Sequence, residues 1–358
     1  MTYYTHTMSK YIQPNQGGLF DKAIRLEELH QMGDPLARLD EVIDWSLFAP
    51  VLARLPKAEP KGLGGRPPFA PGLMFKALVI ASLYQIGDLQ LQFQITDRLS
   101  FKRFLGLTDA DKAPDEKTFW AFRDMLVRHD LLKPLFDLFH ATLEARGMFA
   151  RKGQMVDATF VEVPRQRNSR EDNATIKAGA APVEWEDQPE KARQKDVDAR
   201  WTLKNHERHY GYKNHVKVDS RSKLIEDFTV TAASVHDSQV LEELIAEGDP
   251  TTYADSAYAG ARCEAIFAQR KVAFKPIERA YRNKPLNGNQ KRSNRARSKV
   301  RVRVEHVFAT MRMCMRRGWN RCIGLRRNRA AVALTNLVYN MVRFEQIERL
   351  GLKNWRVA

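Results

Sequence analysis

The chain has 358 residues, of which 59 are lysine or arginine, 43 are aspartate or glutamate, and 43% are hydrophobic. This length and composition allow one to three domain cores, and no apolar run reaches the roughly 18 residues that a membrane-spanning helix needs. The net charge of +16 favours a nucleic acid over acidic small molecules as the partner.

The first residues lack the apolar core of a secretory signal, so we expect the chain to stay in the cytoplasm. The cysteines fit this location, because Cys263, Cys314 and Cys322 form no CxxC pair and no even framework. Disulfide bonds and a cysteine-based zinc site are therefore not expected.

The N-terminal part is predicted to be helical. Residues 1–62 contain an amphipathic segment and end in a Pro- and Gly-rich linker. From residue 63 to 148 the apolar spacing is helical throughout, and Pro114 and Asp115 provide one of the helix starts. We interpret residues 63–148 as a domain for DNA binding or dimerisation.

Basic residues in this helical domain suggest a way to hold DNA. Arg98, Lys102 and Arg103 surround the segment LSFKRFLGL and could belong to a helix-turn-helix motif. A helical bundle that only packs or dimerises is the alternative.

At Gly153 the apolar spacing changes from helical to alternating, which marks a second domain over residues 150–345, followed by a tail over 346–358. Three strands are followed by alternating helices and strands, an α+β or α/β pattern with the sequential order of a ribonuclease-H-like, mixed five-stranded sheet. The expected strands cover residues 154–163, 212–219, 223–231, 250–255 and 272–277, and the expected helices cover 236–248 and 260–270.

Residues 164–208 interrupt this pattern. They are polar and charged with almost no apolar periodicity, so we predict a long mobile insertion on the surface.

Three acids from separate elements could share metal ions. Asp157 lies in the middle of an apolar strand, where an unpaired charge would cost several kcal/mol, and Asp255 ends a strand at its carboxyl end, where open sheets place ligand sites. Glu305 is the only acid in the expected helix 298–315. Hard divalent ions prefer carboxylate oxygens, and two such ions about 4 Å apart support phosphoryl transfer.

Each of these acids also has a plainer interpretation. Asp157 could be a satisfied core aspartate, and Glu305 could be an ion-paired structural residue. Other acids near them occupy strand or helix ends, where an acid is an ordinary turn or cap residue. These are Asp219, Asp227 and Asp237. His206, His209 and His215 have spacings that a metal could use, but no fourth soft ligand accompanies them.

A one-signed basic tract lies between Arg270 and Arg329, where 20 lysines and arginines face only Glu278 and Glu305. The rest of the chain is therefore close to neutral. A solvated surface normally mixes both signs, so the tract indicates a footprint for phosphates, with a merely soluble basic surface as the alternative. Trp319, among these arginines, could stack on an unpaired base or could be a core or hinge residue.

Several motifs together carry a family resemblance. HYGYKNHVKVD, VTAASVHDSQ, YADSAYAG and VRVEHVFATMR resemble the catalytic domain of bacterial transposases of the insertion-sequence-five (IS-five) family. GRPPFAPGLMFKALVIASLYQIGDLQLQFQITDRLSFKRFLGL resembles the N-terminal domain of that family. The similarity runs from about Asp34 to about Phe344, and the motifs occur in the same order as in the family.

The resemblance implies a DDE transposase with Asp157, Asp255 and Glu305 as its three acids and two Mg²⁺ ions per site, for which Mn²⁺ can substitute. Such an enzyme cleaves DNA at the inverted-repeat ends of an insertion sequence, and the released 3′-hydroxyl attacks target DNA in the same site. Joining two ends implies a homodimer or a larger synaptic complex. The location would be the bacterial cytoplasm, on the nucleoid.

Related families carry a signature at the third acid: Tyr, two residues, Arg, three residues, Glu, six residues, Lys. This chain keeps Arg301 and Glu305, but Ser298 replaces the Tyr and Arg312 replaces the Lys. The serine removes a ring, and the arginine keeps a cation with a forked geometry. Only 49 residues separate Asp255 from Glu305, which leaves no room for the large β insertion of some relatives.

The residues expected to contact DNA are basic, polar or aromatic and belong mainly to the basic tract. They are Arg297, Ser298, Lys299, Arg301, Arg312, Arg316, Arg317 and Trp319, with Lys102 and Arg103 from the helical domain. Two other functions remain open: a DNA-binding regulator derived from a transposase that does no chemistry, and a ribonuclease-H-like nuclease that only hydrolyses.

Overall fold

The computed structural model describes Gly18 and residues 20–56, 67–204, 206–282, 285–315, 319–353 and 355. Most of the expected linker, and Arg316 and Arg317, lie outside these residues. The N-terminal part is helical, as predicted, and the side chain of Asp115 caps α7 by accepting a 2.7 Å hydrogen bond from the Thr118 amide. Its helices are α1 (Asp21–Gln31), α2 (Pro35–Val42), η1 (Trp45–Phe48), α3 (Ala49–Leu52), α4 (Pro71–Tyr84), α5 (Asp88–Asp97), α6 (Leu99–Leu105), α7 (Glu116–Arg128) and α8 (Leu132–Ala145).

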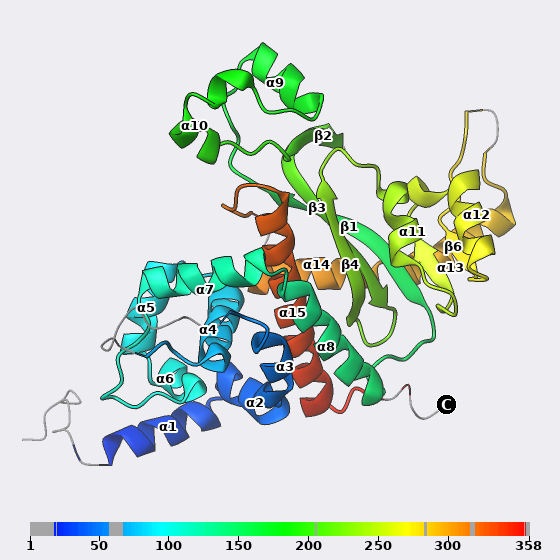
Figure 1. The fold of residues 1–358 in the computed structure, drawn as a ribbon. Coiled ribbons are helices and arrows are strands. Elements are labelled where there is room, and N and C mark those ends of the chain that lie inside the picture. Colours follow the sequence, from blue (N-terminus) through cyan, green and yellow to red (C-terminus); the bar gives the residue numbers. More distant parts are fainter. Residues whose placement is uncertain are drawn as a thin grey trace, which may run out of the picture.

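A mixed sheet follows in the predicted order (Figure 1). β1 pairs antiparallel with β3 and parallel with β5, while β4 pairs antiparallel with β3 and β6 parallel with β5. The resulting order, β4-β3-β1-β5-β6, is that of a ribonuclease-H-like sheet, which confirms the predicted fold class. The strands are β1 (Gln154–Glu162), β3 (Glu207–Asp219), β4 (Ile225–Ala232), β5 (Thr252–Ala254) and β6 (Phe274–Pro276). The helices between them are η3 (Asp237–Val240), α11 (Leu241–Leu244), η4 (Ser256–Tyr258) and α12 (Ala261–Gln269).

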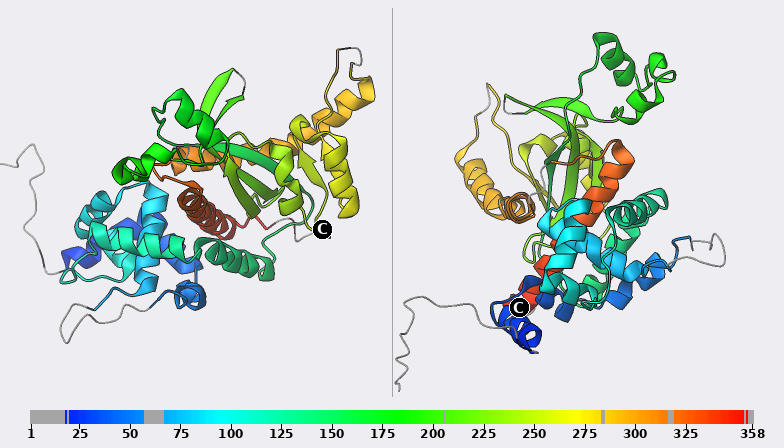
Figure 2. Two further views of the ribbon diagram at one scale, coloured as in Figure 1. Left: turned by 45° about the horizontal axis from the view of Figure 1, so that its top comes forward. Right: turned by 90° about the vertical axis from the view of Figure 1, so that its left-hand side faces the viewer.

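The segment 164–208, which was predicted to be a long mobile insertion on the surface, contains several regular elements. They are α9 (Arg170–Lys177), η2 (Val183–Trp185), α10 (Pro189–Arg193) and β2 (Arg200–Lys204). β2 pairs with the start of β3 and gives the described part of the sheet a sixth strand, where five were predicted. Ile176 and Trp185 are buried, but such sparse apolar anchors produce no periodicity in the sequence. Figure 2 shows α9 and α10 at the periphery of the molecule.

The expected single helix over 298–315 is divided into three pieces. α13 (Gly288–Arg301) ends before Val302, α14 (Arg303–Ala309) follows, and a π-helical turn, η5 (Thr310–Cys314), completes it. One face of α14 is apolar and buried, because Val304, Val307 and Phe308 are buried and α14 packs on β1.

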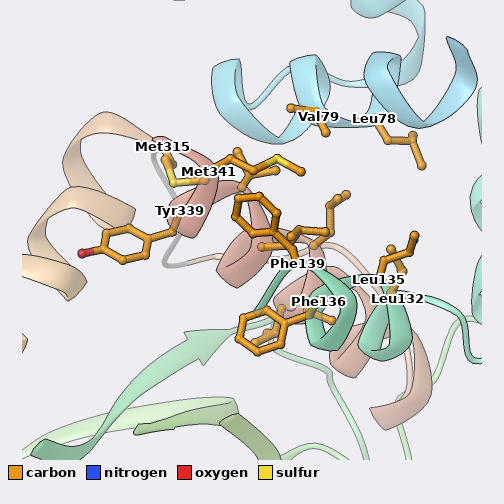
Figure 3. Packing of buried hydrophobic residues seen from close by; sticks show 14 of the residues in the cluster. Leu78, Val79, Leu132, Leu135, Phe136, Phe139, Met315, Tyr339 and Met341 are labelled. Atoms are coloured by element: carbon orange, nitrogen blue, oxygen red, sulfur yellow. The ribbon is translucent and has the colours of Figure 1, made fainter. Parts of the chain in front are cut away.

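A long C-terminal helix, α15 (Leu325–Arg349), was not predicted and extends into the expected tail. It packs against α8, α4 and α2 on one side and against β4 on the other. One hydrophobic cluster therefore runs from the N-terminal helices through α15 to the sheet. Figure 3 shows residues of α4, α8 and α15 meeting there, among them Val79, Phe139 and Met341. A second, smaller cluster joins β1 and β5 to α11 and α12.

Within the described ranges, no single helix is long and apolar enough to cross a bilayer. Only α4 and α5 taken together reach that length, and they meet at a bend of 104°.

Candidate active site

The three predicted acids line one cleft. β1 and β5 are adjacent and parallel, and Val156 of β1 lies beside Ala254 of β5. Asp157 follows Val156 and Asp255 follows Ala254, so the two acids lie at the same edge of the sheet. α14 packs on β1 and brings Glu305 to the same place. The cleft is lined by Asp157, Ala158, Thr159, Phe160, Glu162, Lys204, Glu207, His209, Asp255, Arg301, Glu305, Phe308 and Arg312.

Asp157 is the most buried of the three acids, at 7% exposure. Its Oδ1 accepts a 2.8 Å hydrogen bond from the Ala158 amide, and its Oδ2 accepts one of 2.7 Å from Nη1 of Arg301. Burial raises the pKa of this carboxyl to about 6, against the opposing effects of the Ala158 amide and the Arg301 guanidinium. The arginine supplies the compensating charge that a buried carboxylate requires.

Asp255 and Glu305 are more accessible. Asp255 caps η4, with its Oδ1 accepting a 2.7 Å hydrogen bond from the Ser256 amide. The side chain of Glu305 is 47% exposed, and its Oε1 lies 3.9 Å from Nη1 of Arg301. That exposed, long contact contributes little to stability, and the role of Glu305 stays a prediction.

Cations surround these acids. Arg301 lies between Asp157 and Glu305, while Arg312 and Lys204 line the same cleft. Arg312 is exposed and makes no ion pair with any residue that the structure describes. Lys204, at the end of β2, was not predicted from the sequence, because its place depends on the pairing of β2 with β3.

An aromatic and acidic group completes one wall. The His209 ring stacks on Phe160 with 4.0 Å between ring centroids, and its Nδ1 lies 2.7 Å from Oε1 of Glu162. The sequence pattern indicates His209 only as one of three histidines with spacings that a metal could use. His215 is fully buried, and its Nε2 lies 2.8 Å from the Thr231 hydroxyl. The two histidine rings therefore lie in different environments, and only His209 lines the cleft.

Some residues expected to contact DNA are already hydrogen-bonded or ion-paired with other residues of the protein. Nη1 of Arg297 donates to the Pro276 carbonyl at 2.6 Å and lies 3.1 Å from Glu278. Arg103 bonds to the buried Asp34 at 2.5 Å, and Lys102 lies 3.3 Å from Asp109.

The remaining candidates are exposed. Ser298 and Lys299 are on the surface of α13 but do not line the cleft. Trp319 is 45% exposed, with the Arg321 guanidinium 5.3 Å from its ring. A DNA contact by any of these residues stays a prediction.

The donor set of the cleft suits hard divalent cations, which prefer carboxylate oxygens. Among the described residues, no three histidine, cysteine or carboxylate side chains are already gathered around one point. Asp157 Oδ2 nevertheless holds a cationic group, the Arg301 guanidinium, at hydrogen-bond distance. Its oxygen is therefore placed where a positive charge is stabilised.

Two family models match parts of this chain. Residues 149–341 match the family described as "Transposase DDE domain", and residues 24–125 match "Transposase domain (DUF772)". A solved structure titled "Cryo-EM structure of piggyBac transposase synaptic complex with hairpin DNA (SNHP)" aligns over 90% of this chain and 79% of that chain, with 11% identity and a TM-score of 0.41. The DDE match spans more than half of the chain and includes all three acids of the cleft, and the chain therefore belongs to the DDE transposase family.

Proposed function

We propose that this transposase cleaves DNA at the inverted-repeat ends of an insertion sequence and joins the released 3′-hydroxyl to target DNA in the same cleft. Asp157, Asp255 and Glu305 would hold two Mg²⁺ ions, or Mn²⁺ in their place. The observation that carries the proposal is the convergence of these acids, from β1, β5 and α14, on one cleft that also contains cations. A homodimer or larger synaptic complex would bring two DNA ends together.

Divalent cations bound to these acids would stabilise the attacking and leaving oxygens of an in-line displacement at phosphorus. The other steps fall to the residues of the chain. Arg312 and Lys204 are exposed on the cleft wall and would contact the phosphates on either side of the scissile bond. Arg301 would exchange its bond with Asp157 for one with phosphate as the DNA enters.

Glu305→Gln tests the proposal because it keeps the size of the side chain and removes the charge that a cation needs. We expect cleavage of element-end DNA to fall by several orders of magnitude, while gel-shift binding of the same DNA stays within about threefold of wild type. Glu207→Gln is the matched control, since Glu207 lines the same cleft from a different element. It should cleave like wild type.

The other functions predict different results in the same assays. A regulator would bind the DNA ends without cleaving them in either form. A nuclease would cleave without joining the 3′-hydroxyl to target DNA. Cleavage by Glu305→Gln at the wild-type rate would show that Glu305 holds no catalytic cation.

A further inference from the structure

Tyr258 has a buried hydroxyl with no partner. The residue ends η4, the turn that Asp255 caps, and its backbone amide donates a 3.0 Å hydrogen bond to the Asp255 carbonyl. Its side chain is 0% exposed and packs in the cluster between the sheet and α11–α12. Within the described part of the chain, its Oη finds no hydrogen-bond partner. Such an orphaned polar atom costs free energy and calls for an explanation.

Tyr258 packs in the same cluster as Val156 and Ala254, the residues that precede Asp157 and Asp255. The carboxylates of Asp157, Asp237 and Asp255, together with burial as the largest cause, raise the pKa of Tyr258 well above its usual value. The hydroxyl therefore keeps its proton and can act as a donor. Its natural acceptors are the same three carboxylates.

One of these acceptors is already occupied. Asp237 receives the Lys213 ammonium at 2.8 Å, in an ion pair whose side chains are 10% and 11% exposed, and Nδ1 of His215 lies 3.9 Å from the same oxygen. The other two are the acids of the cleft: Asp157 accepts from the Ala158 amide and from Arg301, and Asp255 accepts from the Ser256 amide through Oδ1. Oδ2 of Asp255 accepts no hydrogen bond from any residue that the structure describes. The unused donor is thus attached to the turn that Asp255 caps, and it is buried in the cluster that contains Val156 and Ala254, the residues directly before the two acids.

We propose that Tyr258 is a positioning residue whose hydroxyl donates a hydrogen bond to the Asp157–Asp255 carboxylate pair when that pair holds a divalent cation. The inference rests on the proposed function. Acids that ligate a cation are commonly oriented by hydrogen bonds from neighbouring groups, and loss of such a bond lowers metal affinity about 10- to 100-fold. Among the residues that the structure describes, the hydroxyl makes no hydrogen bond, so we expect its removal to cost the folded protein nothing when no cation is bound.

Tyr258→Phe separates these two states. In the metal-free full-length protein, Tm should stay equal to that of wild type or rise, because the ring is kept and an unpartnered polar atom is removed. The dissociation constant for Mn²⁺ should increase about 10-fold. Free Mn²⁺ is measured by electron paramagnetic resonance, without DNA, at a temperature where both forms are folded, so that affinity is read independently of stability.

Tyr339→Phe is the matched control. Tyr339 is also buried, at 3% exposure, but lies on α15, and its hydroxyl donates a 2.9 Å bond to the Lys223 carbonyl. We expect the opposite pattern from this variant, a lower Tm and an unchanged Mn²⁺ affinity. Asp157→Asn checks the underlying metal site and should abolish tight Mn²⁺ binding.

The outcomes are distinguishable. Tight Mn²⁺ binding that is lost in Asp157→Asn but unchanged in Tyr258→Phe would overturn the role of Tyr258 and leave the proposed function intact. Absence of Mn²⁺ binding in wild type would overturn both. A Tyr258→Phe protein with wild-type Mn²⁺ affinity and a lower Tm would assign the hydroxyl a purely structural role.

Discussion

The burial of Glu226 makes the free energy of unfolding depend on pH, because it raises the pKa of this carboxyl. Glu226 lies on β4 with 8% exposure, and its Oε1 has no hydrogen-bond partner among the described residues. Burial raises its pKa from 4.5 to about 8, the nearby Lys217 ammonium lowers it, and Asp219 and Asp249 raise it further. Lys217 offers limited compensation, since it is already paired with Asp249 at 2.9 Å. Glu226 is thus protonated in the folded protein at neutral pH.

Glu226→Gln tests this assignment. The folded pKa is above the unfolded one, so the contribution of Glu226 to stability is complete below about pH 4.5 and is lost as pH rises through about 8. We expect the variant and wild type to unfold at similar urea concentrations at pH 5, and the variant to be the more stable at pH 9. Exposed Glu184→Gln serves as control and should show no such pH-dependent difference. Parallel pH profiles for Glu226→Gln and wild type would contradict the raised pKa.

The three acids of the cleft illustrate what could be predicted at this scale. Asp157 is an acid inside an apolar strand and Asp255 ends a strand, so both are visible in the sequence pattern. The cleft also contains Lys204 and stacks His209 on Phe160. Lys204 is placed by the pairing of β2 with β3, and His209 lies in the first part of β3, before the predicted start of that strand at residue 212. The sequence pattern revealed neither. The structure places the three acids together, and their catalytic role stays a prediction until the variants are measured.

At the scale of elements, α15 is attached to the sheet by asparagines. The Asn340 amide accepts a 2.9 Å hydrogen bond from the Ile225 backbone amide and donates one of 2.8 Å to the Ile225 carbonyl. One turn earlier, Asn336 and Asn214 bond to each other, at 2.9 Å and 3.2 Å. All of these side chains are buried. Asn340 thus satisfies backbone groups at the start of β4.

Asn340→Leu should destabilise the protein strongly. The substitution leaves a buried amide and a buried carbonyl without partners, and each costs about 1–3 kcal/mol. We expect a loss of about 2–5 kcal/mol in the free energy of unfolding, measured by urea denaturation. Thr335→Val is the control on the same helix, because the Thr335 hydroxyl bonds only to the Ala331 carbonyl of its own helix. It should cost less than about 1 kcal/mol, and an equal loss in both variants would contradict the role given to Asn340.

The elements that were missed have a common physical cause. Prediction from periodicity needs one apolar face, but α15 is buried on several sides, and 14 of its 25 residues are buried. In α9, η2 and α10 the apolar anchors are too few to form a face. The other strands, β1, β3, β4, β5 and β6, and the helices α11 and α12 were predicted, because each buries one face or a short apolar run.

At the scale of the whole molecule, the basic tract is only partly available to DNA. Arg303 donates to the Ser220 carbonyl at 3.0 Å, and Arg326 and Arg327 are paired with Asp130 and Asp124. The tract therefore displaces fewer counterions than its 20 cations would suggest. Arg312 is exposed and lines the cleft, and we expect it to bind a DNA phosphate.

The salt dependence of DNA binding shows how many cations of the basic tract contact phosphates and how many are bonded within the protein. Each phosphate contact contributes about −0.9 to the slope of log affinity against log salt concentration. We expect a steep negative slope for wild type, and a slope shallower by about 1 in Arg312→Ala. Arg303→Ala, which removes a cation that is bonded within the protein, should leave the slope unchanged. A wild-type slope near zero would contradict the phosphate footprint.

The position of α15 between the N-terminal helices and the sheet bears on what happens to damaged copies of the gene. A premature stop codon before Leu325 removes the helix that both parts of the molecule use to close their core. Each part would then expose apolar surface, which leads to aggregation or proteolysis. A shortened product of this kind could not persist as a folded DNA-binding competitor of the intact protein. An inhibitor could arise more readily from a missense change, such as the loss of Glu305, than from truncation.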